Sequence, residues 1–144
     1  MIATSVLRRA MREIAAKRSD FTLFALFRRA DVPFGNWDLV VSAPWLERDT
    51  LKATREVVDL LVETIGRNGL TELARIEVIH DDNPTVKFIL AKLPVDDGEL
   101  RIQNTDLFGL DIEEGIIFRA KRPESRRNRR KTLQPTAAGS RGRG

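Results

Sequence analysis

Four side chains of types that can do chemistry lie at the ends of two apolar segments. Ser42 and Trp45 end the first segment, and His80 and Asp81 end the second. A hydroxyl, an imidazole and carboxylates are the parts of a hydrolytic site, or of a metal site once Asp82 is included. Each also has a structural explanation, because Asp82 can cap a helix and His80 can end a strand. These residues therefore form a candidate ligand or hydrolase site without an assigned catalytic residue.

No complete catalytic motif accompanies these side chains. Ser42 lacks the Gly-x-Ser-x-Gly pattern that exposes a nucleophile, and the chain has no Gly-rich phosphate-binding loop. The sequence has no cysteine and one histidine, which excludes a disulfide framework, a thiol nucleophile and a multi-histidine metal site within one chain. The sequence therefore favours a non-enzymatic protein that needs no cofactor.

Charge is distributed unevenly along the 144 residues. Residues 121–144 contain nine Lys and Arg against one Glu, whereas residues 19–120 carry a balance of −8. The densest basic run places five cations in six positions, and a short Arg-Gly run follows at 141–144. The cations of the dense run are Arg126, Arg127, Arg129, Arg130 and Lys131. Such a segment can neutralise phosphates and release counterions, which predicts sequence-independent binding to RNA or DNA.

Other interpretations of the basic segment remain open. It could be a solubilising tail, could fold back onto the acidic body, or could contact an acidic protein or a membrane surface. Its only apolar side chains after Arg122 are Leu133, Ala137 and Ala138, too few to offset the entropy of ordering. We therefore expect a globular domain over residues 1–122 and a disordered Arg-rich tail over 123–144.

The apolar pattern of the body predicts three helices and five strands in the order α-β-β-α-β-α-β-β. The predicted helices span 4–18, 50–67 and 84–93, and the predicted strands span 21–27, 37–43, 73–80, 100–103 and 115–120. Residues 21–27 are apolar on both faces, which suits a central strand and leaves a helix open. We expect a single small α/β or α+β domain in which about three helices flank a mixed sheet.

Several local features are predicted within these elements. Thr4 or Ser5 should cap the first helix, and Asp82 should cap the third. Leu51 and Leu61 should share the buried stripe of the second helix with Val58 and Ile65. Phe21 should face the same way as Leu23, Ala25 and Phe27, and residues 104–109 should separate the last two strands.

The strand-helix-strand unit over residues 38–80 should be a right-handed crossover with parallel strands. The carboxyl ends of its two strands would then meet at one edge of the sheet, where open α/β sheets tend to bind ligands. This edge would bring Ser42 and Trp45 close to His80 and Asp81. No uncharged run exceeds nine residues, and no secretory segment is evident, so we expect a soluble cytoplasmic protein without a transmembrane segment.

Overall fold

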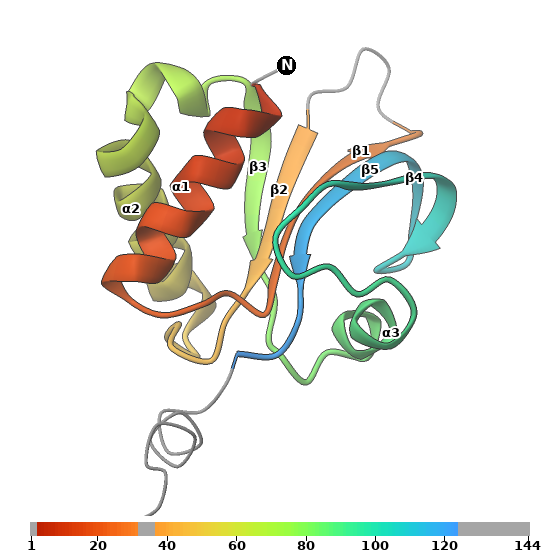
Figure 1. The fold of residues 1–144 in the computed structure, drawn as a ribbon. Helices are drawn as coiled ribbons and strands as arrows, with labels where there is room; N and C mark the ends of the chain where they lie inside the picture. The colour runs from red at the N-terminus through yellow and green to blue at the C-terminus, as the bar shows by residue number, and fades with distance from the viewer. Residues whose placement is uncertain (1–2, 32–36, 124–144) are drawn as a thin grey trace, which may run out of the picture.

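The computed structural model describes residues 3–31 and 37–123. Within these ranges the helices and strands follow in the predicted order (Figure 1). The helices are α1 (Thr4–Lys17), α2 (Thr50–Leu70) and α3 (Pro84–Lys92). The strands are β1 (Leu23–Arg29), β2 (Trp37–Ser42), β3 (Leu73–Val78), β4 (Leu100–Leu107) and β5 (Leu110–Ala120). Residues 32–36 and nearly all of the predicted tail lie outside the described residues.

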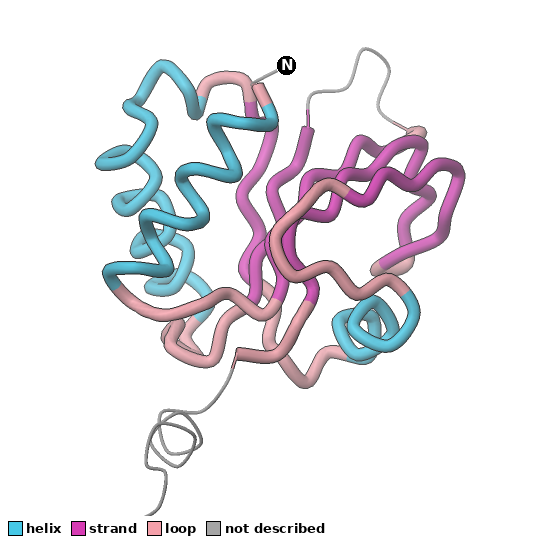
Figure 2. Tube along the Cα trace, viewed as in Figure 1, coloured by secondary structure: helices cyan, strands magenta, loops and turns pink. Residues whose placement is uncertain are grey.

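The five strands form one mixed sheet in the order β3-β2-β1-β5-β4. Only β2 and β3 run parallel, joined by the α2 crossover, and the other neighbours are antiparallel. Helices α1 and α2 pack together against one face of the sheet, and α3 packs against the other face (Figure 2). The predicted α/β domain with a mixed sheet is confirmed.

The central position of β1 in the sheet explains why the sequence of this strand is apolar at nearly every position. Phe24 and Leu26 point into the core beneath α1 and α2, whereas Leu23, Ala25 and Phe27 point into the core beneath α3. The helical alternative for this segment is therefore wrong. Phe21 precedes the strand and packs against Phe24, with ring centroids 5.0 Å apart, so its predicted orientation toward the Leu23 side was also wrong.

The buried face of α2 differs from the predicted stripe. Leu61 is fully buried with Ala53, Val57 and Leu60, but Leu51 is 62 % exposed. Leu60 lies nine positions after Leu51, which is about 2.5 helical turns and places these two side chains on opposite sides of the helix. Leu51, in the first turn of α2, therefore fits the spacing of the predicted apolar stripe but does not face the core.

The helix ends also correct several expectations. Ala3 occupies the N-cap position of α1 and gives no side-chain cap, so neither Thr4 nor Ser5 has that role. Asn83 caps α3 in place of Asp82, because its side chain accepts a 2.8 Å hydrogen bond from the Thr85 N–H. Helix α2 runs on to Leu70 across a break at Gly66, whose φ is 79°.

The β4–β5 hairpin is longer than predicted. Leu107 pairs with Leu110, which leaves Phe108 and Gly109 as a two-residue loop with φ values of 56° and 72°. Two-residue hairpin loops favour positive φ at both positions. Phe is not a residue type that indicates a positive φ, so the sequence did not predict this loop. The separating segment expected at 104–109 is therefore mostly strand.

Candidate functional site

The predicted edge of the sheet exists. Figure 1 shows the carboxyl ends of β2, β3 and β5 at the same edge, where β1 begins. Val41 on β2 pairs with Val78 on β3, and the N–H of Ile79 donates a 2.9 Å hydrogen bond to the Val41 carbonyl. Ser42 and the segment from His80 to Asp82 follow directly, so the parallel pairing places them together.

Ser42 is fully buried, and its hydroxyl donates a hydrogen bond to Asp81 Oδ1. Thr22, also fully buried, donates a 2.8 Å hydrogen bond from Oγ1 to Asp81 Oδ2. The Thr22 N–H donates a further 2.7 Å bond to the Ser42 carbonyl. One carboxylate therefore satisfies two buried hydroxyls and ties the start of β1 to the end of β2. This arrangement is a structural tie, and we call it the Asp81 tie.

His80 takes no part in the Asp81 tie. β3 ends at Val78 and not at residue 80, so His80 follows the strand and is exposed. Within the described residues its ring makes no hydrogen bond to Ser42 or Asp81. A Ser-His pair of the kind that activates a nucleophile is therefore not assembled at this edge.

A hollow of about 250 Å³ lies beside the tie. His80, Asp81 and Asp82 line it from the β3 side, and Glu47 and Arg48 line it from the loop after β2. The charges in the hollow are mixed. Among the described residues, no group of three or more His, Asp or Glu side chains is gathered so as to hold a metal ion.

Trp45 belongs to a different surface. Its Nε1 donates a 3.1 Å hydrogen bond to the Asp20 carbonyl, and the Arg18 guanidinium lies 4.9 Å from its ring centroid. It lines a wider hollow of about 650 Å³ along α2 and not the hollow beside His80. Of the four predicted ligand-site residues, Ser42 and Asp81 are in contact, His80 and Asp81 share a hollow, and Trp45 lies apart.

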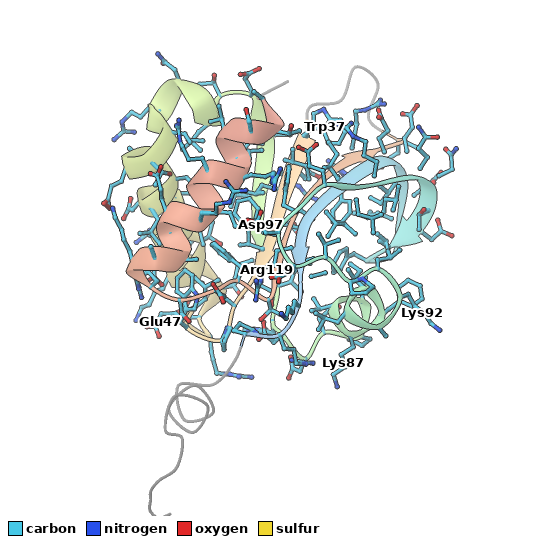
Figure 3. All side chains as sticks on the ribbon, viewed as in Figure 1. Trp37, Glu47, Lys87, Lys92, Asp97 and Arg119 are labelled. Carbon is cyan, nitrogen blue, oxygen red and sulfur yellow. The ribbon has the colours of Figure 1, made fainter. Side chains whose placement is uncertain are left out.

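Arg119 is a structural residue, although it lies two positions before the basic C-terminal segment. Its side chain, labelled in Figure 3, is 9 % exposed and lies near the end of β5. Nε donates a 2.6 Å hydrogen bond to the Phe21 carbonyl, and Nη1 donates a 2.9 Å bond to Asp96 Oδ1. The sequence signal was its position inside the apolar run from Ile116 to Ala120. The Arg119 guanidinium therefore holds parts of the folded domain together.

A basic groove that sequence reasoning missed begins where β5 ends. Lys87 on α3 lines a hollow of about 390 Å³ together with Lys121 and Arg122, and all three residues are exposed. The other lining residues are apolar: Leu90, Ala91, Pro94 and Ala120. Lys121 Nζ lies 3.5 Å from Asp96 Oδ2, and neither Lys87 nor Arg122 forms an ion pair with another described residue. We call this hollow the α3 groove.

The predicted nucleic-acid-binding residues Arg126, Arg127, Arg129, Arg130 and Lys131 lie outside the described residues. The chain reaches them directly from Lys121 and Arg122, two of the cations that line the α3 groove.

Comparisons with models of known families, with curated proteins and with solved structures found no match for this chain. Within the described residues no helix combines the length and the apolar character needed to cross a membrane.

Proposed function

We propose that the protein is a non-enzymatic binding or adaptor protein whose C-terminal basic segment makes sequence-independent contacts with nucleic acid. The observation that carries this proposal is the segregation of charge, nine Lys and Arg against one Glu in residues 121–144 beside an acidic body. A dense cationic segment binds phosphates through counterion release and needs no particular base sequence.

The folded part of the chain supports the proposal through a cationic surface beside the basic segment and through the structural role of Ser42. Lys121 and Arg122 are exposed and share the α3 groove with Lys87, so the basic segment begins at a surface that is already cationic. At the candidate hydrolytic site on the sheet edge, the hydroxyl of Ser42 is buried and donates a hydrogen bond to the Asp81 carboxylate. Ser42 and Asp81, two of the groups that could have done hydrolytic chemistry, therefore have structural roles, which favours binding over catalysis.

The acidic body sets the strength of the interaction. Residues 19–120 carry −8 and compete with phosphates for the cations of the basic segment. Binding should therefore be modest at physiological ionic strength and should tighten as salt is lowered.

Fluorescence anisotropy of a labelled oligonucleotide at several salt concentrations tests the proposal. With four or five phosphate contacts, log K should fall with log salt at a slope of about −3 to −4.5. Replacing Arg126, Arg127, Arg129, Arg130 and Lys131 by Ala should flatten that slope, because the slope counts phosphate contacts. The matched control replaces five surface cations of the body, Arg9, Lys52, Arg55, Arg67 and Arg101, and should keep the slope. Absence of binding near about 50 mM salt, or a slope shared with the five-Ala variant, would contradict the proposal.

Ligand binding beside His80 is the second candidate function, favoured by the hollow that His80, Asp81 and Asp82 line. Its hydrolytic form has less support because Ser42 is buried and bonded to Asp81. Titration with Zn²⁺, Mg²⁺ or phosphate should shift the His80 ring resonances and raise the melting temperature with ligand excess if this function holds. Unmoved resonances throughout the titration would remove the metal and anion forms of this candidate.

A further inference from the structure

The outer face of α3 carries an exposed aromatic ring between cations. Phe88 is 49 % exposed, and Leu51 is the other large apolar side chain with high exposure among the described residues. Lys92 lies four positions after Phe88, and Lys87 precedes it, so all three fall on the exposed arc of the helix. Figure 3 shows Lys87 and Lys92 extending from α3 into solvent.

Phe88 is not needed to fill the core beneath α3. Val86 and Ile89, both fully buried, anchor the opposite side of the helix against the sheet. Leu90 and Leu93 extend the same contact as partly buried side chains. The helix is therefore held in place by residues other than Phe88, and the ring of Phe88 presents apolar surface to solvent.

The segment that carries Phe88 is cationic within a body that is acidic overall. The segment from Asn83 to Val95 contains two Lys and no Asp or Glu. Within the described residues Lys87 and Lys92 form no ion pair, and the α3 groove adds Lys121 and Arg122 beside Lys87. The nearest acidic positions in sequence are Asp82, before the helix, and Asp96, which pairs with Arg119 and Lys121.

We propose that this face of α3 contacts single-stranded nucleic acid, with Phe88 stacking on an unpaired base while Lys87, Lys92 and Arg122 contact phosphates. The inference rests on the proposed function and deepens it by naming the form of nucleic acid. An aromatic ring stacks on a base only where the base is unstacked from its neighbours, which single strands allow and regular duplexes do not. Charge complementarity selects this occupant, because Lys87, Lys92 and Arg122 form no ion pair with another described residue and match a phosphate backbone.

The α3 face supplies a contact that the basic segment lacks. Residues 121–144 contain no Phe, Trp or Tyr, so that segment alone binds single strands and duplexes by charge. Stacking on Phe88 adds a contribution to the binding free energy that only single strands allow. The full chain should therefore prefer a single strand to a duplex of equal length at matched salt.

The test compares the full-length protein with Phe88→Ala and Phe88→Leu on labelled single-stranded DNA, single-stranded RNA and duplex DNA. Loss of one stacked base should weaken single-strand binding by roughly 5- to 150-fold and leave duplex binding unchanged. Phe88→Trp should preserve the single-strand preference. Leu51→Ala, at the other exposed apolar side chain, is the matched control and should bind as wild type. An unchanged thermal midpoint for each variant shows that the fold is intact.

A second pair of measurements separates charge from stacking. Lys87→Ala with Lys92→Ala should reduce the single-strand salt slope by about 1 to 1.5, since each phosphate contact on a single strand contributes about 0.7. Phe88→Ala should leave that slope in place while lowering the affinity.

The outcomes distinguish the inference from the function on which it rests. If wild type binds with a slope that the five-Ala variant loses, but Phe88→Ala and Phe88→Leu bind single strands as wild type does, the α3 contact is overturned and the proposed function stands. Absence of wild-type binding overturns both. Binding to anionic lipid vesicles that depends on Phe88, without an effect of Phe88 on oligonucleotide binding, also overturns the α3 contact.

Discussion

Thr22 and Asp81 lie 59 positions apart in the chain and are joined by a 2.8 Å hydrogen bond at the edge of the sheet. The same carboxylate accepts the hydroxyl of Ser42, so three segments meet at one side chain. Buried hydroxyls without a partner are costly, and Asp81 satisfies two of them. Ser42 and Asp81, two of the residues that first suggested chemistry, are therefore explained by the folding of this edge.

Asp81→Ala should destabilise the protein by about 1–3 kcal/mol, because it leaves the buried hydroxyls of Thr22 and Ser42 without their acceptor. The control Asp82→Ala, at an exposed neighbour, should change the free energy of unfolding by less than about 0.5 kcal/mol. Urea denaturation monitored by circular dichroism measures both. Equal effects at the two positions would show that the tie contributes nothing to stability.

Leu61→Ala should cost about 2–5 kcal/mol, since Leu61 is fully buried and its truncation leaves a cavity between α2 and the sheet. Leu51→Ala removes the same atoms from an exposed position of the same helix and should cost under about 1 kcal/mol. Chemical denaturation of the two variants gives the comparison. A large loss at Leu51 would mean that the apolar stripe predicted from the spacing was correct after all.

Asp97 should make stability fall in acid. Arg12, through a 2.7 Å hydrogen bond from Nε, and then Arg8 lower the pKa of Asp97 below its ordinary value. The folded protein thus keeps this carboxylate ionised to a lower pH than the unfolded chain does. Its contribution is present above the unfolded value of about 4 and is lost as pH falls through the folded value.

The difference in unfolding free energy between wild type and Asp97→Asn should therefore shrink as pH falls from about 5 to below 3. Asp106→Asn is the matched control, because Asp106 is exposed and forms no ion pair with the described residues. Denaturation curves across this range decide the matter. A difference that stays constant with pH would show that the Asp97 contacts do not contribute through ionisation.

A chain that ends at Arg122 should keep the thermal midpoint of the full-length protein to within a few degrees. The truncation point lies just after β5, and the sequence beyond it holds too few apolar side chains to add to the core. Differential scanning calorimetry of the two forms makes the comparison. Loss of a cooperative transition on truncation would show that the removed residues belong to the folded domain.

The order of elements and the parallel pairing of β2 with β3 could be predicted because both depend on apolar periodicity and on the handedness of crossovers. The apolar pattern gave wrong predictions where local geometry decides the structure. Phe108 occupies a positive-φ loop position that its type does not signal, and Leu51 matched a stripe from the wrong side of α2. For the candidate site, the pattern brought Ser42 and Asp81 to one edge. It could not show that their groups bond to each other, since Thr22 completes the arrangement from a distant segment.

The place of β5 in the sheet has a consequence for the kinetics of folding. Within the described residues β5 is the last strand, and it pairs with β1 along most of its length, so the sheet gains this inner strand only after residues 110–120 have been made. Until then β1 is an edge strand with unpaired backbone groups and an apolar side chain at nearly every position, a form prone to intermolecular pairing. The many contacts between distant segments should also slow the search for the native arrangement. Folding of the sheet during synthesis must therefore wait for almost the whole body, and a nascent chain stopped before Leu110 is the form most exposed to aggregation.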